Sequence, residues 1–139
     1  MSLLPQPMGI PVPRPSFHSR PYWEGCSRQQ LLSQRCAECS FRGLSAFTVC
    51  ARCHATATSP VWEESAGQGS LYSWTVVWRP PDPTFVVPYA PAVVYLDEGF
   101  FMLSAVIGCE PDALRLGLRL AVEFHPASDD ITLPYFRPT

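Results

Sequence analysis

Two closely spaced cysteine pairs, followed by a series of short alternating strands, predict a mainly β protein. Its parts are a short N-terminal helix, a rubredoxin-like zinc ribbon and a C-terminal OB-fold barrel of the Greek-key type. Of the 139 residues, 47% are hydrophobic and 16% are charged, which is typical of a globular chain. We divide the chain into a proline-rich extended arm (1–19), an aromatic helix with the ribbon (20–60) and the barrel (61–139).

The first 19 residues contain five prolines, which fix φ and remove amide donors. We therefore expect an extended, mobile arm, either a free tail or a strap along a partner. A helix is expected from Arg20 to about Gln30, because Pro21 suits a first helical turn. Tyr22 and Trp23 would share one side of it. They would pack on the ribbon or form the partner interface, since buried aromatic anchors dominate interfaces.

The cysteines Cys36 and Cys39 form one Cys-x-x-Cys pair, and Cys50 and Cys53 form a second pair after ten intervening residues. A strand over residues 31–35 leads into the first pair. Four thiolates at this spacing can surround one Zn²⁺ tetrahedrally. Such a site has no open coordination position, so the predicted zinc is structural and takes no part in catalysis.

Two other interpretations of these cysteines were considered. Residues 50–54 also match the Cys-x-x-Cys-His pattern of haem attachment, but that use leaves Cys36 and Cys39 without a role. Disulfides belong to oxidising compartments, and residues 1–19 carry no apolar segment typical of an export signal. We therefore expect a cytoplasmic protein that binds metal. No apolar run approaches the ~20 residues that a membrane-spanning helix needs.

The barrel elements are predicted from β-branched and aromatic stretches between turn residues. Residues 62–65 can form a first strand, and residues 70–79 a second that carries Tyr72, Trp74, Val76 and Trp78 on one face. A proline-rich loop (80–89) follows, and loops of this length are usually functional. The remaining expectations are strands over 92–96 and 100–107 joined by a turn at 97–99, a helical turn within 110–117, and strands over 118–125 and 131–136.

The sequence offers no recognisable catalytic motif. It contains no phosphate-binding P-loop, no GxGxxG and no nucleophile elbow. Its three histidines lie in the arm, beside the cysteines and on the outer face of a predicted strand, without an evident partner for acid–base chemistry. The ten basic residues, all arginine, leave a formal net charge of −2, which counts against binding to a phosphate backbone.

The order of motifs resembles a known family. RPYWEG, CAEC…CARC, GQGSLYSWTVV, PYAPAVVYLDEG, GCEPDALRLGLRLAVEF and TLPYFRP follow one another from Arg20 to the C-terminus. The chain is similar to the acyl-CoA-associated proteins that fuse a zinc ribbon to an OB-fold, long catalogued as a domain of unknown function. All four cysteines of that family's ribbon are present.

The resemblance implies a non-catalytic accessory subunit of a heteromeric complex. The expected partner is a thiolase-superfamily enzyme (an aldolase, thiolase, acyltransferase or lipid-transfer-protein-like thiolase) in lipid or steroid side-chain metabolism, for which the chain would help to form an acyl-CoA channel. A hot-dog-fold enoyl-CoA hydratase is an alternative partner.

Aromatic residues can stack a nucleotide base, the loop could cover the pantetheine arm and an arginine could meet a phosphate. The expected channel residues are Tyr72, Trp74, Trp78, Arg79, Phe85 and Tyr89. A second alternative is a single-stranded nucleic-acid-binding protein, since ribbons and OB-folds both serve that role.

Overall fold

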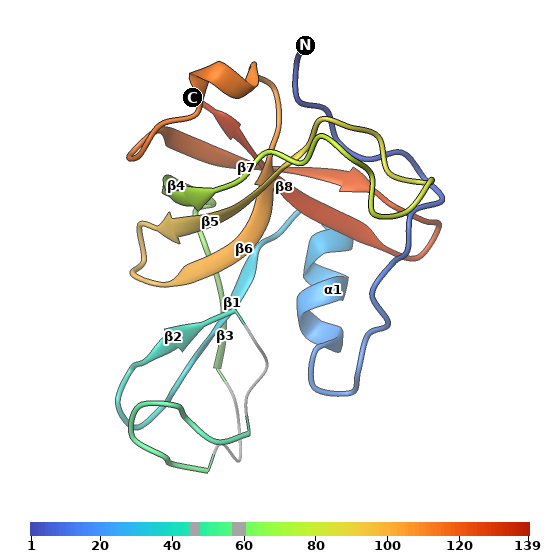
Figure 1. The fold of residues 1–139 in the computed structure, drawn as a ribbon. Helices are drawn as coiled ribbons and strands as arrows, with labels where there is room; N and C mark the ends of the chain where they lie inside the picture. Colours follow the sequence, from blue (N-terminus) through green and yellow to red (C-terminus); the bar gives the residue numbers. More distant parts are fainter. Residues whose placement is uncertain (45–47, 57–60) are drawn as a thin grey trace.

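The computed structural model describes residues 1–44, 48–56 and 61–139. The elements along the chain are α1 (Arg20–Ser27), β1 (Leu32–Arg35), β2 (Arg42–Gly43), β3 (Val61–Glu64), β4 (Gln68–Trp74), β5 (Ala90–Leu96), β6 (Phe101–Val106), the 3₁₀ turn η1 (Pro111–Ala113), β7 (Arg119–Pro126) and β8 (Thr132–Pro138). Figure 1 shows the barrel above, the ribbon below it, and α1 alongside.

The barrel is closed, in the strand order β4-β5-β6-β8-β7, with β7 returning to β4. All neighbouring strands are antiparallel except β6 and β8, which are parallel and meet at Val106 and Phe136. The side chain of Arg137 on β8 also binds Glu123 on β7, with nitrogen–oxygen distances of 2.5 and 3.0 Å. The five strands and the turn η1 between β6 and β7 confirm the predicted OB-fold.

The ribbon contains a three-stranded sheet in the order β2-β1-β3. Residues 62–65 were expected to open the barrel, but β3 hydrogen-bonds to β1, with Trp62 opposite Gln34. Its Glu63 carboxylate also binds Arg35 and Arg42 from the two other strands, at 2.7 Å each. These ion pairs link β3 to both other strands of the sheet. The proposed division at residue 61 therefore falls at the start of a ribbon strand.

The N-terminal arm is packed against the barrel, so the expectation of a mobile tail is wrong. Leu3 is fully buried and Ile10 is 7% exposed. The amide of Leu3 donates to the carbonyl of Cys109, and the amide of Gly108 donates to the carbonyl of Leu3, both at 2.8 Å. Prolines keep the arm extended, while Leu3 and Ile10 are buried and the backbone amides of Leu3 and Gln6 hydrogen-bond to the barrel.

The helix α1 joins the ribbon side of the molecule to the barrel core. Tyr22 and Cys26 are buried on α1, and with Leu31 they belong to the same apolar cluster as the barrel interior. The helix ends at Ser27, before the expected Gln30, because Gln29 takes a left-handed backbone conformation (φ 61°). One continuous core therefore connects α1, the start of β1 and the barrel.

A bulge in β4 corrects the predicted aromatic face. The register with β5 shifts between Leu71 and Ser73, so Trp74 pairs with Ala92, which is 2% exposed. Directly paired residues project to the same side of a sheet, so Trp74 points to the side of Ala92, but at the end of the strand it is 36% exposed. Tyr72 instead lies outside against Phe101, with ring centroids 4.9 Å apart. The strand ends at Trp74, and Val76 and Trp78 lie beyond it.

Among the described residues, no helix has both the length and the apolar character needed to cross a membrane.

Candidate functional site

The two Cys-x-x-Cys pairs form equivalent turns. In the first turn, the amide of Ser40 donates to the carbonyl of Cys36 (2.9 Å), and the amide of Cys36 donates to that of Phe41 (2.8 Å). In the second, His54, Cys50 and Ala55 repeat this pattern at 3.0 and 2.9 Å. Ser40 and His54, each directly after its second cysteine, have positive φ angles of 65° and 63°. The spacing of the sequence motif thus produces two matching loops.

The four sulfur atoms meet between these loops. They all lie within 4.8 Å of one another, with separations of 3.7 Å between Cys36 and Cys53 and 3.6 Å between Cys39 and Cys50. A tetrahedral metal with bonds of ~2.3 Å to sulfur requires sulfur–sulfur separations of roughly 3.8 Å. All six cysteines are free thiols. The residues therefore fit one tetrahedral metal ion with four sulfur ligands, and neither the haem nor the disulfide interpretation accounts for this arrangement.

Backbone amides lower the pKa of two of the four thiols. The amide of Phe41 is the main reason why the pKa of Cys39 falls to about 6, and the amides of Cys53 and Arg52 lower the pKa of Cys50. Arg52 adds positive charge beside the cluster, because its guanidinium donates to the carbonyl of Cys39 at 2.6 Å. Thiolates are the form that binds metal, so these amides favour the ligand state of Cys39 and Cys50. The pKa of Cys53 is instead raised to about 12, because the hydrogen bond from the amide of Ala55, which lowers it, is outweighed by burial and the neighbouring thiols.

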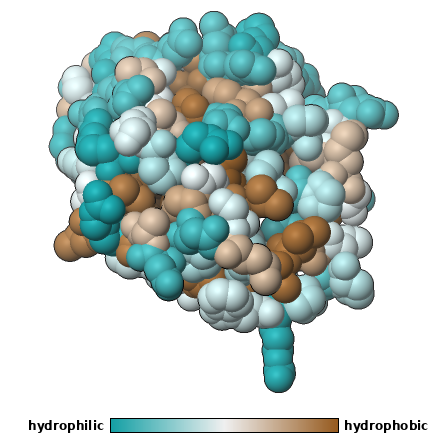
Figure 2. Space-filling model, turned by 90° about the horizontal axis from the view of Figure 1, so that it is seen from above, coloured by the Kyte–Doolittle hydropathy of each residue, from teal (hydrophilic) through white to brown (hydrophobic). Residues whose placement is uncertain are grey.

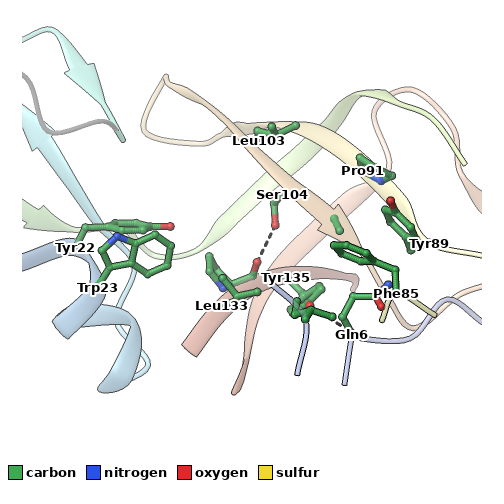
Figure 3. Close-up of a pocket in the computed structure, with 13 residues that line it drawn as sticks. Gln6, Tyr22, Trp23, Phe85, Tyr89, Pro91, Leu103, Ser104, Leu133 and Tyr135 are labelled. Carbon is green, nitrogen blue, oxygen red and sulfur yellow. Dashed lines mark hydrogen bonds between the residues drawn. The ribbon is translucent and has the colours of Figure 1, made fainter. Parts of the chain in front are cut away.

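A second candidate site is an apolar cavity of about 320 Å³ on the barrel surface. Tyr22 and Trp23 of α1 form one side, and Phe85 and Tyr89 of the long loop form the other, with Tyr135 between them (Figure 3). The remaining lining residues are Gln6, Ile10, Pro91, Leu103, Ser104, Ala105, Leu133 and Pro134. Four separate segments thus build one pocket: the arm, α1, the loop and the barrel wall.

The cavity has no ionised group in its wall. Burial raises the pKa of both Tyr22 and Tyr135 above the ordinary value, so their hydroxyls stay neutral at physiological pH. The Ser104 hydroxyl donates to the carbonyl of Pro134 at 2.9 Å (Figure 3). None of the 13 lining residues in the described chain is acidic or basic. The cavity is therefore suited to an uncharged, apolar group.

The structure distributes the six expected channel residues over three places. Phe85 and Tyr89 line the cavity, with their rings stacked at 5.6 Å. Tyr72 lies instead on an exposed aromatic patch with Tyr95 and Phe101, where the Tyr95–Phe101 ring centroids are 4.7 Å apart. The other three, Trp74, Trp78 and Arg79, are exposed at the end of β4 and in the segment after it.

The two residues expected at a partner interface also differ in position. Tyr22 is 8% exposed and belongs to the core, whereas Trp23 is half-buried at the side of the cavity. Gln6, Leu133 and Tyr135 also line the cavity and were not among the residues predicted for a site. Only the alternation of the last strand could have indicated Leu133 and Tyr135, and nothing in the arm's composition indicates Gln6.

The cavity overlaps the ligand face of the OB-fold and extends from it onto β8. This face is formed by the second and third barrel strands and the loops beside them, which here are β5, β6 and the loop before β5. The chain's own arm and helix α1 cover part of it, through Gln6, Ile10 and Trp23. Several arginines are also engaged by carboxylates: Arg35, Arg42, Arg119 and Arg137. This arrangement gives little support to the nucleic-acid alternative.

Comparison with known proteins relates both sites to one family. The model of the ChsH2 C-terminal OB-fold domain matches residues 62–125. A probable enoyl-CoA hydratase alpha subunit of Thermomonospora curvata is 34% identical over 128 residues, which are 91% of this chain and 40% of that protein. A DUF35 domain-containing scaffold protein of Methanothermobacter thermautotrophicus is 25% identical over 104 residues, 74% of this chain and 77% of that protein.

Among solved structures, a chain of the Ltp2–ChsH2(DUF35) aldolase is similar with a TM-score of 0.82 and 31% identity. The alignment covers 91% of this chain and 98% of that one. This chain therefore spans about two fifths of the hydratase subunit but nearly all of the matched aldolase chain. The match extends beyond the barrel and includes the ribbon. The chain belongs to the DUF35 family, in which it combines a four-cysteine ribbon with an OB-fold barrel.

Proposed function

We propose that this chain is a non-catalytic accessory subunit of a thiolase-superfamily enzyme that acts on acyl-CoA thioesters in lipid or steroid side-chain metabolism. The observation that carries the proposal is the similarity of 91% of this chain to 98% of a chain of the Ltp2–ChsH2(DUF35) aldolase. The name of the archaeal relative, a scaffold protein, supports a role in assembly. In this role the chain binds the enzyme and forms part of the wall of its acyl-CoA channel.

The metal in this proposal is a structural Zn²⁺ held by Cys36, Cys39, Cys50 and Cys53. With four sulfur ligands, the ion stabilises the ribbon and leaves no position for substrate. The ribbon's own sheet is small, since β2 has two residues and β1 has four. A structural zinc can supply roughly 10–16 kcal/mol of apparent folding free energy to such a segment.

We place the enzyme contact on exposed aromatic surface. Tyr72, Tyr95 and Phe101 are 56%, 41% and 50% exposed on the outside of the barrel. Figure 2 shows that hydrophobic side chains also reach the surface between polar ones on the face seen from above. Apolar patches of this kind mark interaction sites. Trp23, at the edge of the cavity, is the residue of α1 that we assign to the interface.

The proposed channel wall includes Phe85 and Tyr89, which line the cavity, and Tyr72 on the aromatic patch. We assign Trp74 and Trp78 to stacking against the adenine and Arg79 to a phosphate of the coenzyme. These roles suit their exposure at the end of β4 and in the loop after it.

A second candidate partner is a hot-dog-fold enoyl-CoA hydratase. It is favoured by the 34% identity to the probable hydratase alpha subunit, although this chain spans only 40% of that protein. The fold and the zinc site would serve the same purpose in either complex. The two candidates differ in the enzyme that this chain binds.

Co-expression separates these possibilities. The full chain is produced with a thiolase-like enzyme, and separately with a hot-dog-fold hydratase, from the same genome. The molar mass of each purified sample is then measured by light scattering. We expect a stable heteromer with the thiolase-like enzyme. A heteromer with the hydratase alone supports the second candidate, and a chain that elutes by itself in both samples contradicts the proposal.

A further inference from the structure

The apolar cavity on the barrel is held open by specific contacts between distant parts of the chain. Gln6, which is 9% exposed, makes three of them. Its side-chain amide donates to the carbonyl of Val86 (2.9 Å) and its side-chain oxygen accepts from the amide of Val86 (2.8 Å). Its own backbone amide donates to the hydroxyl of Tyr135 (3.1 Å). One glutamine thus ties the arm, the long loop and β8 together around the cavity.

The two sides of the cavity are rigid for separate reasons. On the α1 side, the ring of Trp23 meets that of Tyr22 edge-on at 4.8 Å, and Tyr22 is fixed in the core. On the loop side, the stacked rings of Phe85 and Tyr89 lie next to the residue that Gln6 holds. The space between them is therefore maintained by the fold. Pre-formed apolar cavities of roughly 300 Å³ or more are typical of small-molecule sites.

The wall defines the class of ligand. It is uncharged and mostly aromatic and aliphatic, and the hydroxyls of Ser104 and Tyr135 already hydrogen-bond to the protein backbone. None of the described residues in the wall has an ionised side chain that could pair with a buried charge on a ligand. At the mouth, Leu103 is 73% exposed, so the cavity opens to solvent on one side. An alkyl or alicyclic group can enter while a polar head remains outside.

We propose that this chain by itself binds the apolar end of the acyl group in the cavity between Trp23 and Phe85, with Gln6 as the residue that positions the wall. The identification of the ligand as an acyl group rests on the proposed function. The cavity then selects the length and shape of the acyl chain, a role distinct from holding the coenzyme.

Binding of straight-chain alkanoates to the isolated full chain tests this proposal. Hexanoate, octanoate and decanoate are titrated calorimetrically below their micellar concentrations. We expect affinity to rise about fourfold per added methylene until the cavity is full, which is ~0.8 kcal/mol per buried CH₂ converted to a binding ratio. No binding, or an affinity that does not depend on chain length, overturns the proposal.

Two variants locate the site. Ala105→Phe adds a ring to the cavity wall and should abolish the length dependence. Gln6→Glu keeps the size of the side chain but places a carboxylate against the Val86 carbonyl, and should weaken decanoate binding at least tenfold. Gln68→Glu makes the same charge change at an exposed position on β4 and should leave binding unchanged. Thermal unfolding confirms that each variant is folded, and unchanged binding in a folded Ala105→Phe contradicts the assignment.

The outcomes separate this inference from the proposed function, because enzyme binding is measured in parallel. A chain that binds the enzyme but no alkanoate retains the accessory role and loses the acyl site. A chain that binds alkanoates with the expected length dependence but no enzyme retains the site and loses the role. If the assembled complex excludes alkanoates that the free chain binds, a partner side chain fills the cavity, and the proposed role in selecting the acyl group is wrong.

Discussion

Substituting Leu3 tests whether the proline-rich arm is an integral part of the fold. Leu3 is fully buried in the main apolar cluster, and its backbone is hydrogen-bonded on both sides to the segment that follows β6. A Leu→Ala change at such a site costs about 2–5 kcal/mol, because it removes apolar contacts and leaves a cavity. With an unfolding entropy of ~2.1 cal/mol/K per residue, this corresponds to a fall in Tm of roughly 7–17 °C for a chain of this length.

The matched control is Leu4→Ala, one residue further along the same arm. Leu4 is 60% exposed, so its truncation should change Tm by no more than about 2 °C. Both variants and the parent chain are compared by thermal unfolding, followed by circular dichroism under identical conditions. If Leu3→Ala unfolds at the same temperature as Leu4→Ala, the arm contributes nothing to stability, and its packing against the barrel is refuted.

Three further changes test the metal site and the barrel. Cys50→Ser should release the bound metal, whereas Cys109→Ser, outside the cluster, should retain one ion per chain by elemental analysis; equal metal contents would contradict the ligand assignment. Gly69→Ala puts a Cβ 2.6 Å from a carbonyl oxygen of β5 and should destabilise the chain by about 1–3 kcal/mol in denaturant titration. In the control Gly43→Ala, the nearest atom to the added Cβ is a ring carbon of Phe41 at 3.8 Å, so the stability should not change. The pKa of Glu123 is lowered to about 2, mainly by its arginine partner on β8. Its contribution to folding stability is therefore present above pH ~4.5 and lost on acidification toward pH 2. Glu123→Gln should flatten this part of the Tm–pH curve, and an unchanged curve would refute the assignment.

The ribbon and barrel could be predicted because their signals are local. The spacing within each cysteine pair determines a turn, and the two turns form the same hydrogen bonds around Ser40 and His54. The alternation along residues 118–125 likewise places Leu120 inside the barrel, where it is fully buried. The β3 strand was assigned to the barrel because its partner β1 lies before both cysteine pairs in the sequence, and no local pattern reports this pairing.

The arm and the cavity could not be predicted because they depend on contacts between distant residues. The backbone amide of Gln6 meets Tyr135, which is 129 positions away. A proline-rich composition indicates an extended chain but does not say what that chain packs against. The alternation of side chains along β4 also does not predict its bulge. One extra residue, Tyr72, places the side chains that follow it on the opposite faces of the sheet. The residues expected to line one aromatic channel therefore lie in different places, some in the cavity and others on exposed surface.

In the proposed accessory role, the exposed patch contacts the enzyme and the cavity holds the acyl group. Tyr72 and Phe101 lie on the outside of β4 and β6, where an enzyme could cover them, while Phe85 and Tyr89 line a pre-formed space. The four-cysteine ribbon shares an apolar core with the barrel interior through Leu31. Loss of the metal should therefore weaken assembly without changing any catalytic group.

The most direct test of the accessory role is to measure turnover with separated components. Cleavage or hydration of an acyl-CoA substrate is followed for this chain alone, for the partner enzyme alone, and for the two combined at equal molar amounts. The accessory role predicts no turnover by this chain alone and an increase of at least tenfold when it is added to the partner. Turnover by the isolated chain, or a partner that reaches full activity without it, would contradict the account.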